Sequence, residues 1–396
     1  MTKKYLIFLS VFFLIAILSQ CSNPELEEND HKKIEKQSSL NLHSALPKVV
    51  KDPSDNLSNS HKIKLGKFLF YDPILSGDKD VACATCHHPQ NGYAEYRDLS
   101  IGVNGSGFGS KRHFNQPNEI PIVKRNAHTI LNTAFNGIDT TNSYSPKDAP
   151  MFWDMRASSL EEQALIPIQS FEEMRGSHFL ENEILNEVVN RLKNISEYVS
   201  LFKDAFDESE SINEQNIGKA IAAFERTLVT TETRFDKYMR GDKKAISLGE
   251  QVGFRLFKKV GCANCHKSAM FSDFKSHVVG VPANPKLPEF DKGINDDYAF
   301  RTPSLRSLRY TAPYMHNGKF NTLKEVLEFY EDISNSKNRH VEVKAEQIDP
   351  LINQLDLSVK EITPIISFLN TLNDVNFDRS IPVSVPSGLP VGGNIN

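Results

Sequence analysis

Apolar residues recur at helical spacing in several separate stretches of the chain. Apolar positions three and four residues apart share one face of an α-helix, so each stretch predicts a helix with one buried side. The expected helices cover residues 159–166, 180–206, 215–230, 246–259, 322–330 and 358–372. Ser358 with Glu361, and Asn321 with Lys324 and Glu325, resemble helix N-termini. The pattern predicts an all-α fold.

Residues 88–152 do not follow this periodicity. The stretch is rich in glycine and carries Pro117, and both residue types interrupt regular elements. An irregular segment of this length inside a compact domain is more often functional than decorative. We therefore expect long loops between the helices.

The N-terminal residues are expected to form an export signal. Lys3 and Lys4 precede an apolar run that is too short to cross a bilayer comfortably. Residues 1–20 would form the signal, and Cys21 would be the lipidated first residue of a periplasmic lipoprotein. An ordinary cleavage site or an uncleaved anchor is the alternative, because Gln20 differs from the small residue usual before such a cysteine.

Length, charge and composition narrow the class of protein further. The chain has 396 residues, enough for about two domains, because single cores rarely grow beyond roughly 250–300 residues. A net charge of -4, with acids and bases interspersed, gives no field of one sign, so no nucleic acid is expected as a partner. Residues 21–56 are polar, highly charged and without periodicity, which predicts a flexible tether.

All cysteines except Cys21 fall in two C-x-x-C-H motifs, the attachment sequence of c-type haem. Two thiols at this spacing add to the haem vinyl groups, and the adjacent imidazole binds the iron. A single motif could instead belong to a zinc site or a redox disulfide. Two motifs that use every cysteine outside the leader favour haem and leave no cysteine for a structural disulfide. The predicted attachment residues are Cys83, Cys86 and His87, and Cys262, Cys265 and His266.

The sequences around the two motifs repeat in the same order. Residues 65–70 precede the first motif much as residues 253–257 precede the second, and residues 124–131 resemble residues 300–308. This order predicts two haem domains related by internal duplication. The expected boundaries place a first domain at 57–235, a second at 236–375 and a C-terminal tail at 376–396.

These motifs resemble the bacterial dihaem cytochrome c peroxidase family and, within it, the MauG-like branch, over about residues 57–372. The resemblance implies two cytochrome c-like helical domains that meet at a shared interface. It implies that the haem of domain 57–235 meets hydrogen peroxide, while the haem of domain 236–375 passes electrons. The expected donor is a small protein such as a monohaem cytochrome or a cupredoxin; a protein substrate is the alternative partner.

The resemblance implies an open first haem. Peroxidases of the family carry a distal histidine in a sequence resembling Ser-Ile-Gly-His-Gly, and the matching stretch here has Val103 in place of that histidine. Valine cannot bind iron, so peroxide would enter without first displacing a side chain, as in MauG-like enzymes. His113 and His128 are alternative distal ligands, unless each is simply a surface or packing histidine.

An acid-base group should lie beside the peroxide. Gln163, Pro167 and Glu173 match, in identity and in spacing from Trp153, the distal residues of MauG-like enzymes. Glu172 is the competing acid-base candidate, and a solvated helix face is the simpler interpretation of the glutamate pair. Trp153, the single tryptophan, would lie between the haems as an electron relay; otherwise it is a core aromatic.

The sixth ligand of the second haem should distinguish the branches. The peroxidases have a methionine fourteen residues after the histidine that His316 matches, and MauG-like enzymes have a tyrosine ligand there. This chain has Tyr330. Met315 and Met270 are the rival ligands. A tryptophan of MauG that takes part in oxidising its protein substrate is replaced by Val260.

The resemblance also implies a calcium ion between the domains. One asparagine side chain and two backbone carbonyls hold it in the family, and the matching residues are Asn126, Thr311 and Pro313. The leading hypothesis is a peroxidase that reduces hydrogen peroxide to water with electrons delivered through the second haem. A MauG-like oxidase and a non-catalytic dihaem electron carrier are the alternatives.

Overall fold

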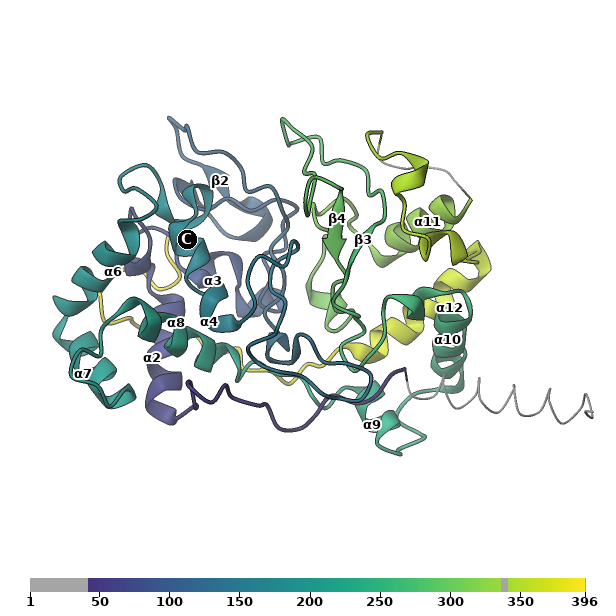
Figure 1. The fold of residues 1–396 in the computed structure, drawn as a ribbon, viewed down its shortest axis with the longest axis horizontal. Coiled ribbons are helices and arrows are strands. Elements are labelled where there is room, and N and C mark those ends of the chain that lie inside the picture. Colours follow the sequence, from purple (N-terminus) through teal and green to yellow (C-terminus); the bar gives the residue numbers. More distant parts are fainter. Residues whose placement is uncertain (1–41, 336–340, 396) are drawn as a thin grey trace, which may run out of the picture. The chain divides into compact units, whose positions relative to one another are not determined.

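The computed structural model describes residues 42–335 and 341–395, and these residues belong to one compact unit. The described residues are mostly helical, as predicted (Figure 1). Two small antiparallel sheets were not predicted. One pairs β1 (Gly105–Ser106) with β2 (His113–Phe114), and the other pairs β3 (Ser276–Val278) with β4 (Ala299–Arg301).

The described residues form α-helices, one π-helical turn and several short 3-10 turns. The α-helices are α2 (Ser60–Tyr71), α3 (Cys83–Cys86), α4 (Leu160–Gln163), α5 (Ile166–Gln169), α6 (Ile184–Lys193), α7 (Ser196–Ala205), α8 (Glu214–Glu225), α9 (Arg234–Met239), α10 (Leu248–Lys259), α11 (Leu323–Ser334) and α12 (Val359–Leu369). A single π-helical turn covers Phe171–Arg175. Short 3-10 turns lie at Pro73–Leu75, Pro89–Asn91, Gly109–Lys111, Thr133–Phe135, Cys262–Asn264, Leu308–Tyr310, Ala345–Gln347, Ile352–Gln354 and Asn370–Leu372.

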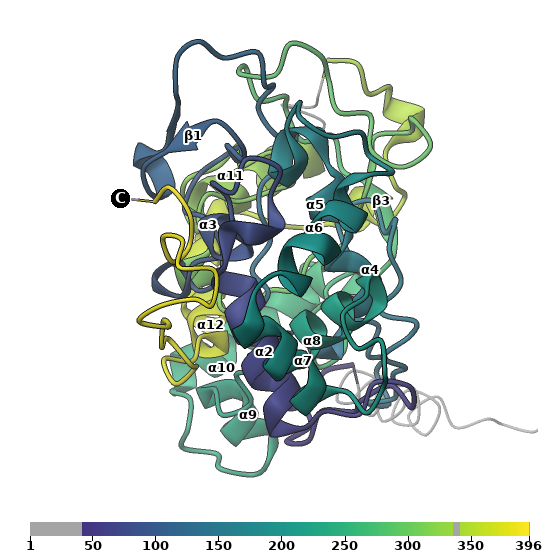
Figure 2. The ribbon, with the colours of Figure 1, turned by 90° about the vertical axis from the view of Figure 1, so that its left-hand side faces the viewer.

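Each haem motif is accompanied by a closely packed helix pair. Helix α2 packs on α7 and α8 (Figure 2), and α10 packs on α12. A glycine makes each approach close: a Cβ added at Gly66 would lie 1.8 Å from the carbonyl oxygen of Ala220, and one added at Gly253 would lie 2.0 Å from that of Pro364. The two helix pairs therefore meet backbone against backbone at corresponding glycines.

Two predicted helices are divided in the structure. The helix expected over 180–206 is broken between α6 and α7, because Ile195 is extended, with φ -112° and ψ 108°. The helix expected over 159–166 becomes α4 and α5. Pro167 has no N–H to donate to the carbonyl of Gln163, so the hydrogen-bond ladder cannot continue through this point. Apolar spacing carries across both breaks and did not reveal them.

The two predicted helix starts have different outcomes. At α12 the prediction is confirmed: the Glu361 carboxylate accepts hydrogen bonds from the backbone N–H of Ser358 at 2.9 Å and from its hydroxyl at 2.8 Å. At α11 the cap is Thr322, not Asn321. The Thr322 hydroxyl accepts a hydrogen bond from the N–H of Glu325, so the helix begins one residue later than expected.

Both ends of the described chain pack against the haem motifs. Residues 42–56, expected to belong to the tether, instead include the buried Leu46, whose N–H donates to Asp236. The C-terminal tail lies beside α3, where the Thr85 hydroxyl donates to the carbonyl of Gly392 at 2.8 Å (Figure 2). Residues 1–41, including the expected signal and Cys21, lie outside the described residues. Among the described helices, none has the length and apolarity needed to span a bilayer.

Candidate active site

The first C-x-x-C-H motif opens onto a cavity of about 680 Å³. Helix α3 places Cys83, Cys86 and His87 along its wall. The Nδ1 of His87 lies 3.1 Å from the carbonyl oxygen of Tyr93 and donates to it. Such a bond fixes the ring and its tautomer, so that Nε2 is the nitrogen left to bind a metal. Burial lowers the pKa of His87, which favours the neutral, ligating imidazole.

The second motif repeats this arrangement. Cys262, Cys265 and His266 line a cavity of about 210 Å³, and the Nδ1 of His266 donates to the carbonyl of Phe271 at 2.9 Å. Burial raises the pKa of the Cys262 thiol to about 12, as it does for Cys83, so both sulfurs are neutral thiols before a cofactor is attached. Paired thiols, a fixed imidazole and an adjoining cavity suit a covalently attached haem at each motif.

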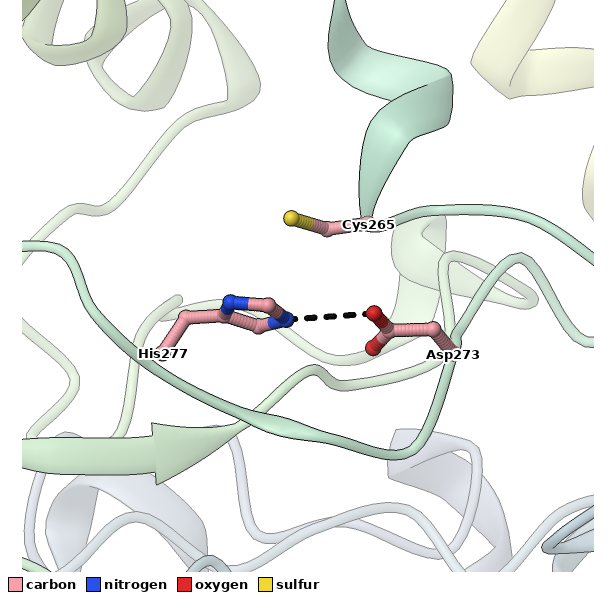
Figure 3. Close-up of side chains that lie close together, drawn as sticks. All are labelled: Cys265, Asp273 and His277. Carbon is pink, nitrogen blue, oxygen red and sulfur yellow. Dashed lines mark hydrogen bonds and ion pairs between the residues drawn. The ribbon is translucent and has the colours of Figure 1, made fainter. Parts of the chain in front are cut away.

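A cluster of Cys265, Asp273 and His277 beside the second cavity was not predicted (Figure 3). Their potential ligand atoms all lie within 4.8 Å of one another. The Nε2 of His277 lies 3.1 Å from Asp273, and its Nδ1 lies 2.6 Å from Asp349. The carboxylates of Asp273 and Asp349 raise the pKa of His277 above its usual range.

This cluster is better described as an ion pair than as a metal site. Thioether formation would consume the Cys265 thiol, which leaves His277 and Asp273 as an ion pair without a third ligand. The Asp273 carboxylate therefore serves as counter-ion to His277. The spacing of these two residues, four apart, was the only signal in the sequence, and Asp349 comes from a distant segment.

The predicted distal residues meet at the first cavity. Gln163, Pro167, Glu172 and Glu173 all line it. The protein atoms around Glu173 desolvate its carboxyl and raise its pKa to about 7. A carboxyl that is part protonated and part ionised at neutral pH can accept and release a proton, which is the property an acid-base group needs.

The Glu173 turn rests on the loop that carries Val103. The backbone N–H of Val103 donates to the carbonyl of Glu173 at 3.1 Å. A Cβ added at Gly102 would lie 2.1 Å from that carbonyl oxygen and 2.3 Å from the carbonyl oxygen of Glu172. Val103 itself is fully buried in the hydrophobic core with Met174. The absence of a side chain at Gly102 thus sets how closely this loop supports the π-turn.

The two histidines considered as distal ligands lie in different surroundings. His113 is exposed on β2, and its Nδ1 is 3.2 Å from the carbonyl of Lys111. His128 lines both cavities and stacks on Trp153, with ring centroids 4.0 Å apart. The carbonyl of His128 also interacts with the His87 imidazole, which puts this segment on the His87 side of the first site.

Trp153 also lines both cavities. Its Nε1 donates to the carbonyl of Asn126 at 3.0 Å, which fixes the ring. Beyond it, the His316 ring lies 6.3 Å away and stacks on Phe300 at 3.7 Å. An aromatic series of His128, Trp153, His316 and Phe300 therefore joins the walls of the two cavities.

The rival ligands of the second site are separated by the fold. Tyr330, on α11, and Met315 both line the second cavity, whereas Met270 lines the first. Burial, with the nearby Cys265 sulfur, raises the pKa of the Tyr330 phenol. The fold therefore leaves Tyr330 and Met315 as the competing residues at this site.

The three residues matched to a calcium site border one cavity. Asn126, Thr311 and Pro313 all line the second cavity. The amide nitrogen of Asn126 donates to the carbonyls of Arg97 at 2.7 Å and Asp98 at 3.3 Å. With the amide NH₂ held in this way, its oxygen remains as the group suited to a cation.

Two further ionisable residues at the first cavity were not predicted. Glu225 is buried on α8, its Oε2 has no hydrogen-bond partner, and burial raises its pKa to about 8. Arg301, on β4, lines both cavities and is 6% exposed. Neither residue lies in a motif with an assigned role, and their convergence on the cavities follows from long-range packing.

Comparisons with known proteins agree on one family. Residues 60–244 match the family model described as di-haem cytochrome c peroxidase. The methylamine utilization protein MauG of Methylorubrum extorquens is 34% identical over 333 residues, 82% of each chain. Cytochrome c551 peroxidase of Nitrosomonas europaea is 31% identical over 336 residues, 83% of this chain and 85% of that protein. Cytochrome c551 peroxidase of Pseudomonas aeruginosa is 33% identical over 297 residues, which cover 72% of this chain and 76% of that protein.

Solved structures share the fold. A MauG-like protein associated with microbial copper homeostasis superposes with a TM-score of 0.66 at 28% identity, covering 83% of this chain and 95% of that one. The diheme peroxidase BthA of Burkholderia thailandensis gives a TM-score of 0.61 at 20% identity, and the match covers 88% of this chain and 98% of that one.

Proposed function

Because the chain belongs to the di-haem cytochrome c peroxidase family and is an oxidoreductase that acts on peroxide with two c-type haems, we propose how its residues divide this work. One haem is attached at Cys83 and Cys86 and the other at Cys262 and Cys265, with His87 and His266 as the proximal ligands. The haems supply the iron that exchanges electrons with peroxide and with the donor. The protein positions the reactants and moves protons.

The observation that carries the proposal is the Glu173 carboxyl at the first cavity, with its pKa raised to about 7 by burial. Reduction of hydrogen peroxide takes up two electrons and two protons and yields two waters. In its ionised form, Glu173 takes a proton from one peroxide oxygen and returns it to the departing one. Gln163 and Pro167 border the same space and position the peroxide.

We place the electron route between the cavities at Trp153. Its ring is fixed by the hydrogen bond to Asn126 and lines both cavities. Electrons from a small donor protein would arrive at domain 236–375 and pass Trp153 to domain 57–235. We further propose that the two domains are duplicates. Each has a helix pair that meets at a glycine, and each has a motif histidine whose Nδ1 donates to a backbone carbonyl.

Turnover distinguishes this function from its rivals. With peroxide and a reduced monohaem cytochrome or cupredoxin, we expect two donor molecules oxidised for each peroxide consumed. A MauG-like oxidase, which Val103 and Tyr330 favour and Val260 disfavours, would instead consume peroxide while modifying a protein or small-molecule substrate. A simple electron carrier would consume no peroxide, and a carboxyl such as Glu173 at its cavity would have no purpose.

Tyr330 is the proposed second ligand at the second site, because it lines that cavity and matches the tyrosine position of the MauG-like branch. Tyr330→Phe should abolish the low-spin signal of one haem, since a phenyl ring cannot bind iron, and should leave the other haem able to bind small ligands. Near-infrared and spin-resonance spectra would measure this. An unchanged signal, together with its loss in Met315→Leu, would assign the ligand to Met315.

Calcium and export complete the proposal. We place calcium at Asn126, Thr311 and Pro313, since these residues border one cavity and the hydrogen bonds of the Asn126 amide nitrogen leave its oxygen as the atom for a cation. Elemental analysis of the purified protein before and after chelation tests this.

We also propose export to the periplasm with lipid on Cys21; the mass of the mature N-terminal peptide would show whether the lipid is present.

A further inference from the structure

Arg301 is held rigidly between the two candidate haem cavities. It ends strand β4, and its backbone N–H donates to the carbonyl of Trp153 at 2.8 Å. Its side-chain Nε donates to the carbonyl of Phe152, also at 2.8 Å. The side chain is almost completely buried and lines both cavities. Since Nε is already bonded, the terminal Nη groups are the donors left to face a ligand.

The charge of Arg301 is uncompensated within the described part of the chain. No ion pair among residues 42–335 and 341–395 includes it. Other buried arginines do have carboxylate partners: Arg306 is bidentate to Asp236, with both distances 2.9 Å, and Arg125 bonds Asp154 at 2.7 Å and Asp291 at 2.5 Å. Burial lowers the pKa of Arg301 to about 10, which still leaves it charged at neutral pH.

An unpaired buried cation is costly, because desolvation is not repaid by any counter-charge. Polar contacts with the carbonyl of Phe152 satisfy one donor without neutralising the charge. A guanidinium fork in this position matches a planar carboxylate that the chain itself does not provide. Each c-type haem brings such carboxylates, its propionates, on the edge opposite the vinyl groups that join the cysteines.

We propose that Arg301 is the shared counter-cation of the two haems, pairing with a propionate of the haem in each cavity. This inference rests on the presence of both haems, but not on which of them meets peroxide. It gives Arg301 two roles. The residue neutralises carboxylates that would otherwise be buried between the cavities, and its positive charge favours the reduced state of both irons.

Reduction potentials of the two haems in the holoprotein test this directly. In Arg301→Gln, both haems should become harder to reduce, because the cation that stabilises the added electron is gone. We expect about a tenfold change in the reduction equilibrium of each, equal to 59 mV for one electron. Arg301→Lys keeps the charge and should restore most of the change. Lys124→Gln is the matched control, since Lys124 is an exposed cation at the first cavity and solvent screens it.

Intact mass would first establish that each variant carries two haems. If Arg301→Gln does not acquire both haems, the test rests on Arg301→Lys, whose reduction potentials should stay close to those of the unmodified protein. The proposal would be overturned if Arg301→Gln left the potentials unchanged or changed the potential of only one haem. It would also be overturned if Arg301→Lys changed the potentials as much as Arg301→Gln is expected to.

Dissolved anions are the other source of negative charge for Arg301. The potentials of the unmodified protein should not change between chloride and phosphate at constant ionic strength. A saturable shift specific to one anion would show that Arg301 binds a free anion, and would also overturn the proposal. These potentials are measured without peroxide, so a failure here is separate from a failure of the peroxidase function.

Discussion

Glu173→Gln should slow the reaction of the holoprotein with hydrogen peroxide by about a hundredfold to ten-thousandfold, the usual effect of removing a general acid-base group. The amide has nearly the shape of the carboxyl, so the cavity and both haems should be retained. It cannot take a proton from peroxide and return it. Stopped-flow mixing of the ferric protein with peroxide, followed by absorbance, measures the rate.

The pH dependence gives a second test of the same carboxyl. Only ionised Glu173 can accept a proton, and burial raises its pKa to about 7. The rate should therefore rise as pH increases through about 7 and fall at lower pH. In Glu173→Gln this step in the profile should disappear.

Glu172→Gln is the matched control, because Glu172 is the adjacent residue and lines the same cavity. Its rate above about pH 7 should remain close to that of the unmodified protein. The step in its pH profile should move to lower pH, because the Glu172 charge helps to raise the pKa of Glu173. A slow reaction in this variant with a normal one in Glu173→Gln would assign the acid-base role to Glu172.

Gly102→Ala should slow the same reaction by about a hundredfold, although the added methyl group itself carries neither a proton nor an electron. The new Cβ would lie 2.1 Å and 2.3 Å from the carbonyl oxygens of Glu173 and Glu172, so the π-turn must move. Displacement of a reacting group by about 1 Å can cost this much in rate. Overpacking should also lower the free energy of unfolding by roughly 1–3 kcal/mol.

Gly249→Ala is the control for adding a methyl group. This glycine lies in α10, and only the Ser247 hydroxyl comes near its added Cβ, at 3.9 Å. Here alanine should stabilise the helix by about 0.5–1 kcal/mol and leave the peroxide reaction unchanged. A normal peroxide rate in Gly102→Ala would show that the loop does not control the position of Glu173. Thermal unfolding and stopped-flow rates measure the two effects separately.

Much of the site chemistry could be predicted from the sequence because it is local. The attachment of a haem depends on residues within one C-x-x-C-H motif, such as Cys83, Cys86 and His87. Helix α10 follows from apolar spacing within a single segment. Helices α6 and α7 were predicted as one because their apolar spacing continues across Ile195, whose extended backbone breaks the helix.

Long-range contacts account for what the sequence did not predict. The Phe152 carbonyl and the Nε of Arg301 are far apart in the chain, and the absence of a counter-ion at Arg301 cannot be seen in any motif. His277 is held by Asp349 from a distant segment. Leu46 lies in a polar stretch whose composition predicts a tether, yet its burial comes from tertiary packing.

The central claim is that the first haem site is open to peroxide in the fully oxidised protein. Val103 cannot bind iron, and it is buried in the core beside the Glu173 turn. The most direct test mixes ferric holoprotein with one equivalent of hydrogen peroxide, without any reductant, and records the optical spectrum. We predict an immediate spectral change, and a change at both haems if Tyr330 is the second ligand. No reaction until one electron has been added would contradict the open site and show that a bound side chain must first leave the iron.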